Sequence, residues 1–213
     1  MTTLIYVRHG QSMANLLKLY AGQKDFALTE SGHRQAARIA AFLKEHYSVS
    51  RVYSSDLARA MDTARPTAKA FSLDVVPLKE LRERCMGVWE GLSQAQIMEI
   101  DAERYITCKQ SNIPVTPKGA ETIEQTFSRA IQAEDQILSE SKGKCVAVFG
   151  HSCIMLNLAK RWKESIPAFE AVFENASITV VNFDDNGSAQ QIELLNYQEH
   201  LGEDATVSIP KLV

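Results

Sequence analysis

Apolar and polar residues along the chain follow two repeating patterns, one typical of strands and one typical of helices. Six segments are short and either uniformly apolar or alternating, which predicts buried or half-buried strands. They lie at residues 3–7, 50–53, 74–77, 145–149, 177–183 and 190–195. The run Asp184–Gly187 is a strong turn signal, so the last two strands are expected to form a hairpin.

Four longer segments repeat apolar residues at three- and four-residue spacing, which predicts helices. They lie at residues 33–47, 57–71, 121–141 and 153–162. Either Thr29 or Ser31 is expected to cap the first helix, because a hydroxyl there accepts a hydrogen bond from an orphaned backbone N–H. Pro66 falls within the second segment and is expected at a break or in a first turn, since proline lacks the N–H that a helix interior uses.

Strands that alternate with helices predict an α/β fold, a three-layer sandwich in which helices flank a mostly parallel central sheet. A single domain is expected to span residues 1–213. Residues 82–119 depart from the pattern, because they are polar, contain Pro114 and Pro117, and show weak periodicity. This segment is expected to form a small inserted, cap-like lobe over the sheet edge and the carboxyl ends of the strands.

Composition narrows the class of protein. With 45% hydrophobic and 23% charged residues, the 213-residue chain matches an ordinary globular fold. The net charge of −3 and the scattered lysines and arginines argue against a nucleic-acid partner, and no apolar run is long enough to predict a membrane span. The four cysteines form no Cys-x-x-Cys pair, and no leader segment is apparent, so a cytoplasmic location and no structural zinc are expected.

Polar clusters follow three of the predicted strands. Arg8, His9 and Gly10 end the first, residues 54–60 follow the second, and residues 150–152 follow the strand at 145–149. In open α/β sheets, ligands bind beyond the carboxyl ends of the strands. The order of elements therefore predicts that four basic side chains converge on one region: Arg8, His9, Arg59 and His151.

Two arginines and two histidines in one cleft would repel one another unless an anion lay between them. The planar donor fork of arginine matches pairs of phosphate oxygens, so a phosphate monoester is the natural ligand. One neutral imidazole nitrogen can then attack phosphorus, while Glu83 is a candidate to protonate the leaving oxygen. Plainer roles stay open, namely a surface ion pair for Arg59, a structural role for His151 and a solvated charge run around Glu83.

Together these residues resemble the histidine phosphatase superfamily, which includes the cofactor-dependent phosphoglycerate mutases. The matching segments, in order, are Arg8-His9-Gly10-Gln11-Ser12 with Asn15; Gly22, Asp25, Leu28, Thr29 and Gly32; Ser54–Thr63; Leu81, Glu83, Gly87, Trp89, Glu90 and Gly91; Gly119, Glu121 and Thr122; and Gly150-His151-Ser152. The resemblance runs from residue 4 to about residue 160 and implies a phosphoglycerate mutase-like fold.

The resemblance also implies roles for individual residues. His9 would become the phosphohistidine, while Arg8, Arg59 and His151 would bind the phosphoryl oxygens. Glu83 would act as the acid and then the base, with no metal and no cofactor. The residues expected to bind substrate are Arg8, Asn15, Gln23, Arg59 and Ser152. Weaker candidates for the substrate end, for which a plain surface position is favoured, are Tyr105, Lys109 and Lys118.

Two departures favour the phosphatase branch of this family over the mutases. Ala21 stands where the mutases usually carry threonine, and Cys85-Met86 stands where they carry His-Tyr. The expected function is a metal-independent phosphatase of the histidine acid phosphatase type, a phosphoric monoester hydrolase acting on small phosphorylated metabolites. The alternatives are a phosphoglycerate mutase-type isomerase and an inactive phosphate-binding regulatory module. Oligomeric state stays open, including a homodimer.

Overall fold

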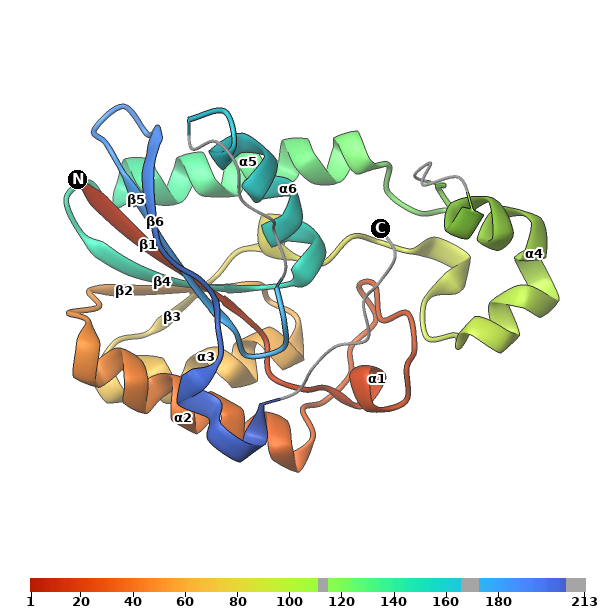
Figure 1. The fold of residues 1–213 in the computed structure, drawn as a ribbon, viewed down its shortest axis with the longest axis horizontal. Helices are drawn as coiled ribbons and strands as arrows, with labels where there is room; N and C mark the ends of the chain where they lie inside the picture. The colour runs from red at the N-terminus through yellow and green to blue at the C-terminus, as the bar shows by residue number, and fades with distance from the viewer. Residues whose placement is uncertain (111–114, 166–172, 206–213) are drawn as a thin grey trace.

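The computed structural model describes residues 1–110, 115–165 and 173–205, and it places a six-stranded sheet between two layers of helices (Figure 1). The strand order is β3-β2-β4-β1-β5-β6. The strands are β1 (Thr2–Arg8), β2 (Arg51–Ser54), β3 (Val75–Pro77), β4 (Cys145–Gly150), β5 (Ile178–Phe183) and β6 (Ala189–Tyr197). Neighbouring strands from β3 to β1 pair in parallel, and β5 pairs antiparallel with both β1 and β6. The predicted mostly parallel sheet is confirmed.

Two helices cover each face of the sheet. Those on one face are α2 (Glu30–His46) and α3 (Ala58–Phe71), and those on the other are α5 (Ile123–Glu140) and α6 (Ser152–Trp162) (Figure 1). Side chains of β1 alternate between the two layers, with Leu4 and Tyr6 in one apolar cluster and Ile5 and Val7 in the other. This alternation follows from the two-residue period of a strand, and it makes β1 the centre of both cores.

Helix starts follow the chemistry of their caps. Thr29 caps α2, with its hydroxyl accepting from the Gly32 N–H, so the first of the two predicted caps is confirmed. Thr122 and Gln125 form a capping box at α5. Because the Thr122 side chain takes the place of a helical partner there, the helix begins at Ile123, two residues later than predicted.

The prediction for Pro66 is wrong. Pro66 lies inside α3, which continues through it from Ala58 to Phe71. A proline there removes one backbone hydrogen bond. The neighbouring Thr63, Ala64 and Thr67 are buried, so packing of that face against the sheet layer offsets the loss.

The segment predicted to be an irregular lobe contains a 17-residue helix, α4 (Gln94–Gln110), after a short turn, η2 (Gly87–Trp89). Asp101 has φ −153° and ψ 45°, so α4 is kinked there. The kink shifts the helical period midway, which is why the sequence shows weak periodicity. Figure 1 places α4 beyond the carboxyl ends of the strands. Trp89, Ile97 and Tyr105 form a small apolar cluster there, separate from the two clusters that flank the sheet.

Three short elements were not predicted. These are α1 (Met13–Leu16), η1 (Lys79–Leu81) and η3 (Glu199–Asp204). A single turn is too short to show a helical period in the sequence. Within η3, the nearly buried Asp204 accepts hydrogen bonds from Arg34 and Arg38, which attaches the end of the described chain to α2.

Candidate active site

The loops that follow β1, β2 and β4 all leave the sheet at the carboxyl ends of these parallel strands. Arg8 at the end of β1 pairs with Gly150 at the end of β4, and Ser54 at the end of β2 pairs with Phe149. The residues that follow are therefore neighbours in space although they lie far apart in sequence. The rings of His9 and His151 have centroids 5.1 Å apart.

The main chain fixes the tautomer of His9. Its Nδ1 atom lies 2.7 Å from the Gly10 carbonyl oxygen, which can only accept a hydrogen bond. The proton of neutral His9 is therefore on Nδ1, and the lone pair is on Nε2. The carbonyl of His9 in turn accepts from the Ala176 N–H and from Asn175 Nδ2, so the backbone is held as well as the ring.

His151 has no solvent exposure and is surrounded by positive charge. Burial lowers the pKa of His151 well below its usual value, and the charges of Arg59, His9 and Arg8 lower it further. Its Nε2 atom lies 2.9 Å from the hydroxyl of Ser55. Its Nδ1 atom is buried and has no hydrogen-bond partner among the described residues, which fits a ligand oxygen at that position.

Arg59 is fully buried, so the surface ion-pair interpretation is wrong for it. Its two Nη groups donate to the carbonyls of Gly22 and Lys24, at 2.8 and 3.1 Å. Its Nε atom is buried without a hydrogen-bond partner among the described residues. Burial lowers the pKa of Arg59, and the nearby Glu83 opposes that effect.

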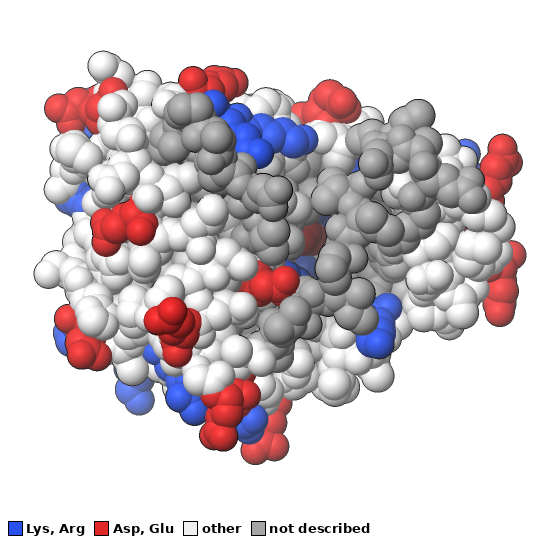
Figure 2. All heavy atoms as spheres, viewed as in Figure 1, with Lys and Arg blue, Asp and Glu red and all other residues white. Residues whose placement is uncertain are grey.

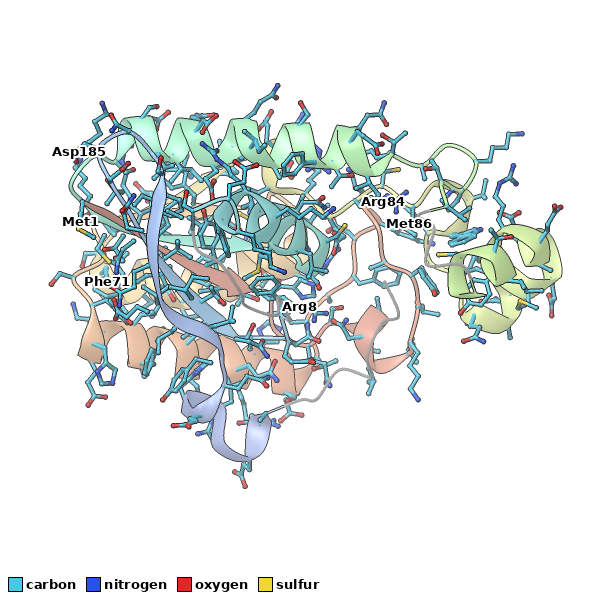
Figure 3. All side chains as sticks on the ribbon, turned by 45° about the horizontal axis from the view of Figure 1, so that its top comes forward. Met1, Arg8, Phe71, Arg84, Met86 and Asp185 are labelled. Carbon is cyan, nitrogen blue, oxygen red and sulfur yellow. The ribbon has the colours of Figure 1, made fainter. Side chains whose placement is uncertain are left out.

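Arg8 lies at the centre of the molecule (Figure 3) and is 4% exposed. Its Nη1 atom donates to the Phe173 carbonyl at 2.6 Å. Burial lowers the pKa of Arg8, while Glu83 and Glu174 favour its charged form. Arginine stays protonated in proteins, so the cleft holds two buried positive charges.

Glu83 belongs to the site and not to a solvated charge run. Its two carboxylate oxygens accept from the backbone N–H groups of Arg84 at 2.8 Å and Cys153 at 3.4 Å. The adjacent arginines face elsewhere, since Arg82 makes a bidentate ion pair with Asp56 and Arg84 donates to backbone carbonyls. Electrostatic interactions link Glu83 to both Arg8 and Arg59.

The other predicted substrate-binding residues are placed less directly. The Oδ1 atom of Asn15 completes the capping box of α1 and accepts from Nδ2 of Asn175. Ser152 is the first residue of α6, directly after His151. Gln23 donates from Nε2 to the Glu83 carbonyl at 3.2 Å, so it contacts the segment that carries Glu83.

The surface position favoured for Tyr105 is wrong. Tyr105 is 4% exposed and lies in the apolar cluster of the lobe, where its ring packs against Trp89 and Tyr20. Lys118 is exposed. The side chain of Lys109 lies outside the described residues.

Sequence reasoning missed three residues that hold the site. Ser55 is within hydrogen-bond reach of His151, Asn175 donates to the carbonyl of His9, and Arg129 of α5 donates to the backbone of Glu83. Ser55 lies in a motif that the sequence analysis recognised, beside Arg59. Asn175 and Arg129 lie outside the recognised motifs, and no local pattern marks them.

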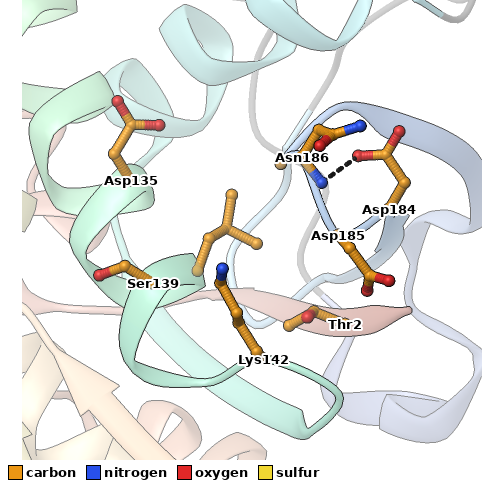
Figure 4. A pocket seen from close by; sticks show the side chains of 9 residues that line it. Thr2, Asp135, Ser139, Lys142, Asp184, Asp185 and Asn186 are labelled. Atoms are coloured by element: carbon orange, nitrogen blue, oxygen red, sulfur yellow. Dashed lines mark hydrogen bonds between the residues drawn. The ribbon is translucent and has the colours of Figure 1, made fainter.

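A hollow lies at the other end of the sheet, near the start of β1 (Figure 4). Its carboxylates have local structural partners. Asp184 accepts from the N–H groups of Asn186 and Ser188 within a turn, and Asp135 pairs with Arg161 of α6. These contacts explain the acidic residues there without a ligand.

Charge is dispersed on the face seen in Figure 2, where basic and acidic atoms are scattered among uncharged ones. Within residues 1–110, 115–165 and 173–205, no three His, Cys, Asp or Glu side chains are grouped so as to hold a metal ion. In the same ranges, no helix combines the length and the apolar character needed to cross a membrane.

Comparison with protein-family models matches residues 4–198 to the histidine phosphatase superfamily, branch 1. The chain is 31% identical to phosphoglycerate mutase-like protein 4 of Arabidopsis thaliana, over 94% of this chain and 87% of that protein. It is 33% identical to a metal-independent phosphoserine phosphatase of the same plant, over 86% of this chain and 77% of that protein.

Other relatives are longer or are known in three dimensions. The chain spans 55% of the length of a bifunctional Mycobacterium tuberculosis protein, to which it is 32% identical over 94% of its own length. Among solved structures, a mycobacterial glucosyl-3-phosphoglycerate phosphatase superposes with a TM-score of 0.77 at 26% identity, covering 92% of this chain and 99% of that one.

Proposed function

Because this chain belongs to branch 1 of the histidine phosphatase superfamily, we propose that it is a phosphatase that hydrolyses phosphate monoesters of small metabolites through a phosphohistidine on His9. The observation that carries the proposal is the convergence of Arg8, His9, Arg59 and His151, none of them more than 4% exposed. Buried positive charge of this density needs an anion, and the relatives named as phosphatases support phosphate.

His9 is the nucleophile in this mechanism. The Gly10 carbonyl holds its proton on Nδ1, so the Nε2 lone pair attacks phosphorus. As the N–P bond forms, the bond between phosphorus and the ester oxygen breaks. The Gly10 carbonyl thereby holds the ring in the orientation that the attack requires.

Arg8, Arg59 and His151 stabilise the charge that builds on the phosphoryl oxygens during transfer. Both arginines stay charged, and Nε of Arg59 and Nδ1 of His151, which are buried without a hydrogen-bond partner among the described residues, are suited to ligand oxygens. The arginines supply the positive charge that Mg²⁺ gives in other phosphoryl-transfer enzymes, so the reaction is proposed to be metal-independent and to need no cofactor. Asn15, Gln23 and Ser152 are proposed to contact the substrate.

Glu83 acts first as the general acid and then as the general base. In its protonated form it gives the proton to the leaving alkoxide as the ester bond breaks. In the second step, the carboxylate accepts a proton from the attacking water. Water then displaces the phosphoryl group from Nε2, which releases inorganic phosphate and restores both His9 and protonated Glu83.

A mutase-type isomerase is the second candidate. One relative carries a mutase-like name, and an isomerase would use the same phosphohistidine with a sugar-acid hydroxyl in place of water as the acceptor. Ala21 and Cys85-Met86, which depart from the mutase pattern, support hydrolysis. An inactive phosphate-binding module is less well supported, because the nucleophile, the acid and the phosphate-binding residues are all present.

Finer assignments belong to the same proposal. The enzyme type is proposed to be that of a histidine acid phosphatase, with a small phosphorylated metabolite as its partner. A cytoplasmic location is supported by the four free cysteines, since reducing compartments keep thiols unpaired. A homodimer is proposed as the assembly to look for in solution.

The proposal is tested by trapping the intermediate. Enzyme mixed with labelled substrate, in the presence of a chelator and quenched within milliseconds, should carry one acid-labile, base-stable phosphoryl group on His9. His9→Asn should abolish the label, whereas His33→Asn, which changes an exposed histidine of α2, should retain it. Label on a serine or aspartate, or turnover that stops with the chelator, would refute the mechanism.

A further inference from the structure

The residue proposed as the acid lies on backbone with no regular structure. Residues 82–86 lie between η1 and η2, outside any helix or strand. Their carbonyls and N–H groups therefore have no ladder of partners, and partly buried backbone groups must find partners elsewhere. The position of the Glu83 carboxylate depends on what holds this segment.

Arg129 of α5 donates to two of these carbonyls, those of Arg82 and Glu83, and also to the carbonyl of Glu80; Gln23 shares the Glu83 carbonyl. The Nη1 atom of Arg129 donates to the carbonyls of Glu80 and Arg82, each at 2.7 Å, and its Nη2 atom reaches the Glu83 carbonyl at 3.4 Å. Its remaining N–H groups go to Glu121, from Nε at 3.0 Å and from Nη2 at 2.7 Å. A guanidinium has five N–H donors, and each of the five has an acceptor here.

Glu121 holds Arg129 from the other side. Its carboxylate receives the arginine in a bidentate arrangement and also accepts from the Cys85 N–H at 2.8 Å. Burial works to raise the pKa of Glu121, but these hydrogen bonds outweigh it and keep the pKa below its usual value. Glu121 is therefore a carboxylate at neutral pH, and together with Arg129 it bonds the backbone on both sides of Glu83.

We propose that Arg129, held by Glu121, is the positioning residue for the catalytic acid: it fixes the backbone of residues 80–85 so that the Glu83 carboxyl group stays beside Cys153 and the two buried arginines. The proposal rests on the proposed function, since it assigns Arg129 to the acid step. Arg129 contacts no reacting atom in this assignment. Its contacts are three backbone carbonyls and one carboxylate.

The contacts of Arg129 also indicate which step of the reaction depends on it. Without it, the carbonyls of Glu80 and Arg82 lose the donor that both share, and the segment can relax toward solvent. His9, Arg8 and Arg59 lie on other loops, and the backbone bonds that hold them do not involve Arg129. Loss of the Arg129 donors should therefore weaken proton donation while leaving the attack on phosphorus intact; Arg129→Lys separates this from an effect of charge, because it keeps the positive charge that, in addition to burial, lowers the pKa of His151.

The experiment compares two substrates that differ in their need for an acid. An alkyl phosphate has a poor leaving group, whereas an activated aryl phosphate leaves as a stable phenolate. Arg129→Gln should lower kcat/KM, which reports only the steps through the first phosphoryl transfer, by about tenfold to a hundredfold on the alkyl phosphate, a part of the about 10²–10⁴-fold contribution of general acid catalysis, and by less than about threefold on the aryl phosphate. Arg129→Lys, which keeps the charge but offers three donors, should show the same selectivity in a milder form.

Glu83→Gln and the double variant complete a cycle. On the alkyl phosphate, Arg129→Gln with Glu83→Gln should be no slower than Glu83→Gln alone, because a positioning residue has nothing left to position. Arg161→Gln is the matched control: it removes an arginine of similar exposure whose ion pairs lie with Glu134 and Asp135, so any loss of stability should affect both substrates equally.

The outcomes separate two kinds of failure. If Glu83→Gln itself shows no dependence on the leaving group, the acid role in the proposed function is wrong. If Glu83→Gln shows that dependence but Arg129→Gln is unchanged, slows both substrates equally, or adds its full loss to that of Glu83→Gln, the positioning role is overturned. Should Arg129→Gln fail to fold, Arg129→Lys and Glu121→Gln carry the same comparison.

Discussion

The two histidines of the cleft are set for different tasks by their immediate neighbours. The carbonyl of Gly10 keeps the proton of His9 on Nδ1, which places the lone pair on Nε2. His151 contacts the hydroxyl of Ser55 and is surrounded by buried positive charge, so it is neutral until an anion arrives. In the proposed mechanism, a bound phosphoryl group supplies that negative charge and makes His151 a better donor when transfer begins.

Arg59 gives the most direct test of the phosphoryl-binding site at the scale of one residue. Arg59→Ala should lower kcat about a hundredfold, because a donor to a transferring group is worth about 3 kcal/mol. Arg59→Lys should recover little of this loss, since an ammonium group cannot bond the carbonyls of Gly22 and Lys24 and also reach the ligand. Steady-state kinetics on one alkyl phosphate measures both variants.

The control for Arg59 is Arg65→Lys in the same helix, whose arginine is exposed and pairs with Asp62. It should keep wild-type turnover. Near-normal kcat in Arg59→Ala would mean that the buried guanidinium only supports the loop at Gly22 and Lys24, and the proposed role in transfer would have to be given up.

What the sequence predicts at this scale depends on whether a residue lies in a recognisable local pattern. Arg8 ends β1, His9 and His151 come directly after β1 and β4, and Arg59 lies in the first turn of α3 after β2, so the order of strands brings the four together. Arg129 differs, because its partners are main-chain carbonyls 46 to 49 positions away and carry no residue identity. Such an interaction leaves no trace in one sequence, and it becomes visible only when the two segments are placed in space.

Helices and strands could be predicted where a segment was long enough to show a regular hydrophobic period and where packing did not override the local preference. The six strands and the four helices that cover the sheet were predicted in order, with ends shifted by a few residues. The lobe helix α4 was missed because its kink at Asp101 interrupts the period. Pro66 was misjudged because burial of the neighbouring Thr63 and Thr67 outweighs a lost backbone hydrogen bond.

The short element η3 contains His200, which is expected to make the stability of the fold depend on pH. His200 in η3 stacks on Tyr197 with ring centroids 5.6 Å apart and lies 5.4 Å from Phe42 of α2. Burial lowers the pKa of His200 to about 4, below the ordinary value near 6.5. The unfolded chain therefore takes up a proton as the pH falls below about 6.5 while the folded chain does not, so His200 costs stability between about pH 6.5 and pH 4.

His200→Phe keeps the ring contacts and removes the titration. Between pH 7.5 and pH 5, its free energy of unfolding should fall by about 1 kcal/mol less than that of the wild type, allowing for partial solvent screening. Urea unfolding at the two pH values measures this difference. His33→Gln, which alters an exposed histidine of α2, should retain the wild-type pH dependence. Equal losses in the wild type and His200→Phe would show that η3 does not hold His200 away from protons.

At the scale of the whole molecule, the sheet and the lobe have different roles. The parallel strands bring the proposed nucleophile and the proposed phosphate-binding residues together at their carboxyl ends, and this arrangement would serve hydrolysis and isomerisation equally well. The choice of acceptor depends on what else can reach the phosphohistidine. In the described part of the lobe, the buried apolar cluster consists of Trp89, Ile97 and Tyr105, while Ile100 and Ile106 of α4 stay 60% and 40% exposed.

A lobe anchored by so small a core is expected to admit water after the first product leaves. Given a monophosphorylated glycerate and a bisphosphorylated primer, the enzyme should therefore release inorganic phosphate faster than it forms the positional isomer. Phosphate release and the two isomers can be followed together by ³¹P NMR in the presence of a chelator. His9→Asn should lose both products, because each needs the same phosphohistidine. Isomer formation that outpaces phosphate release would place the chain with the mutases despite Ala21 and Cys85-Met86, since the intermediate would then be shielded from water long enough to meet a second hydroxyl.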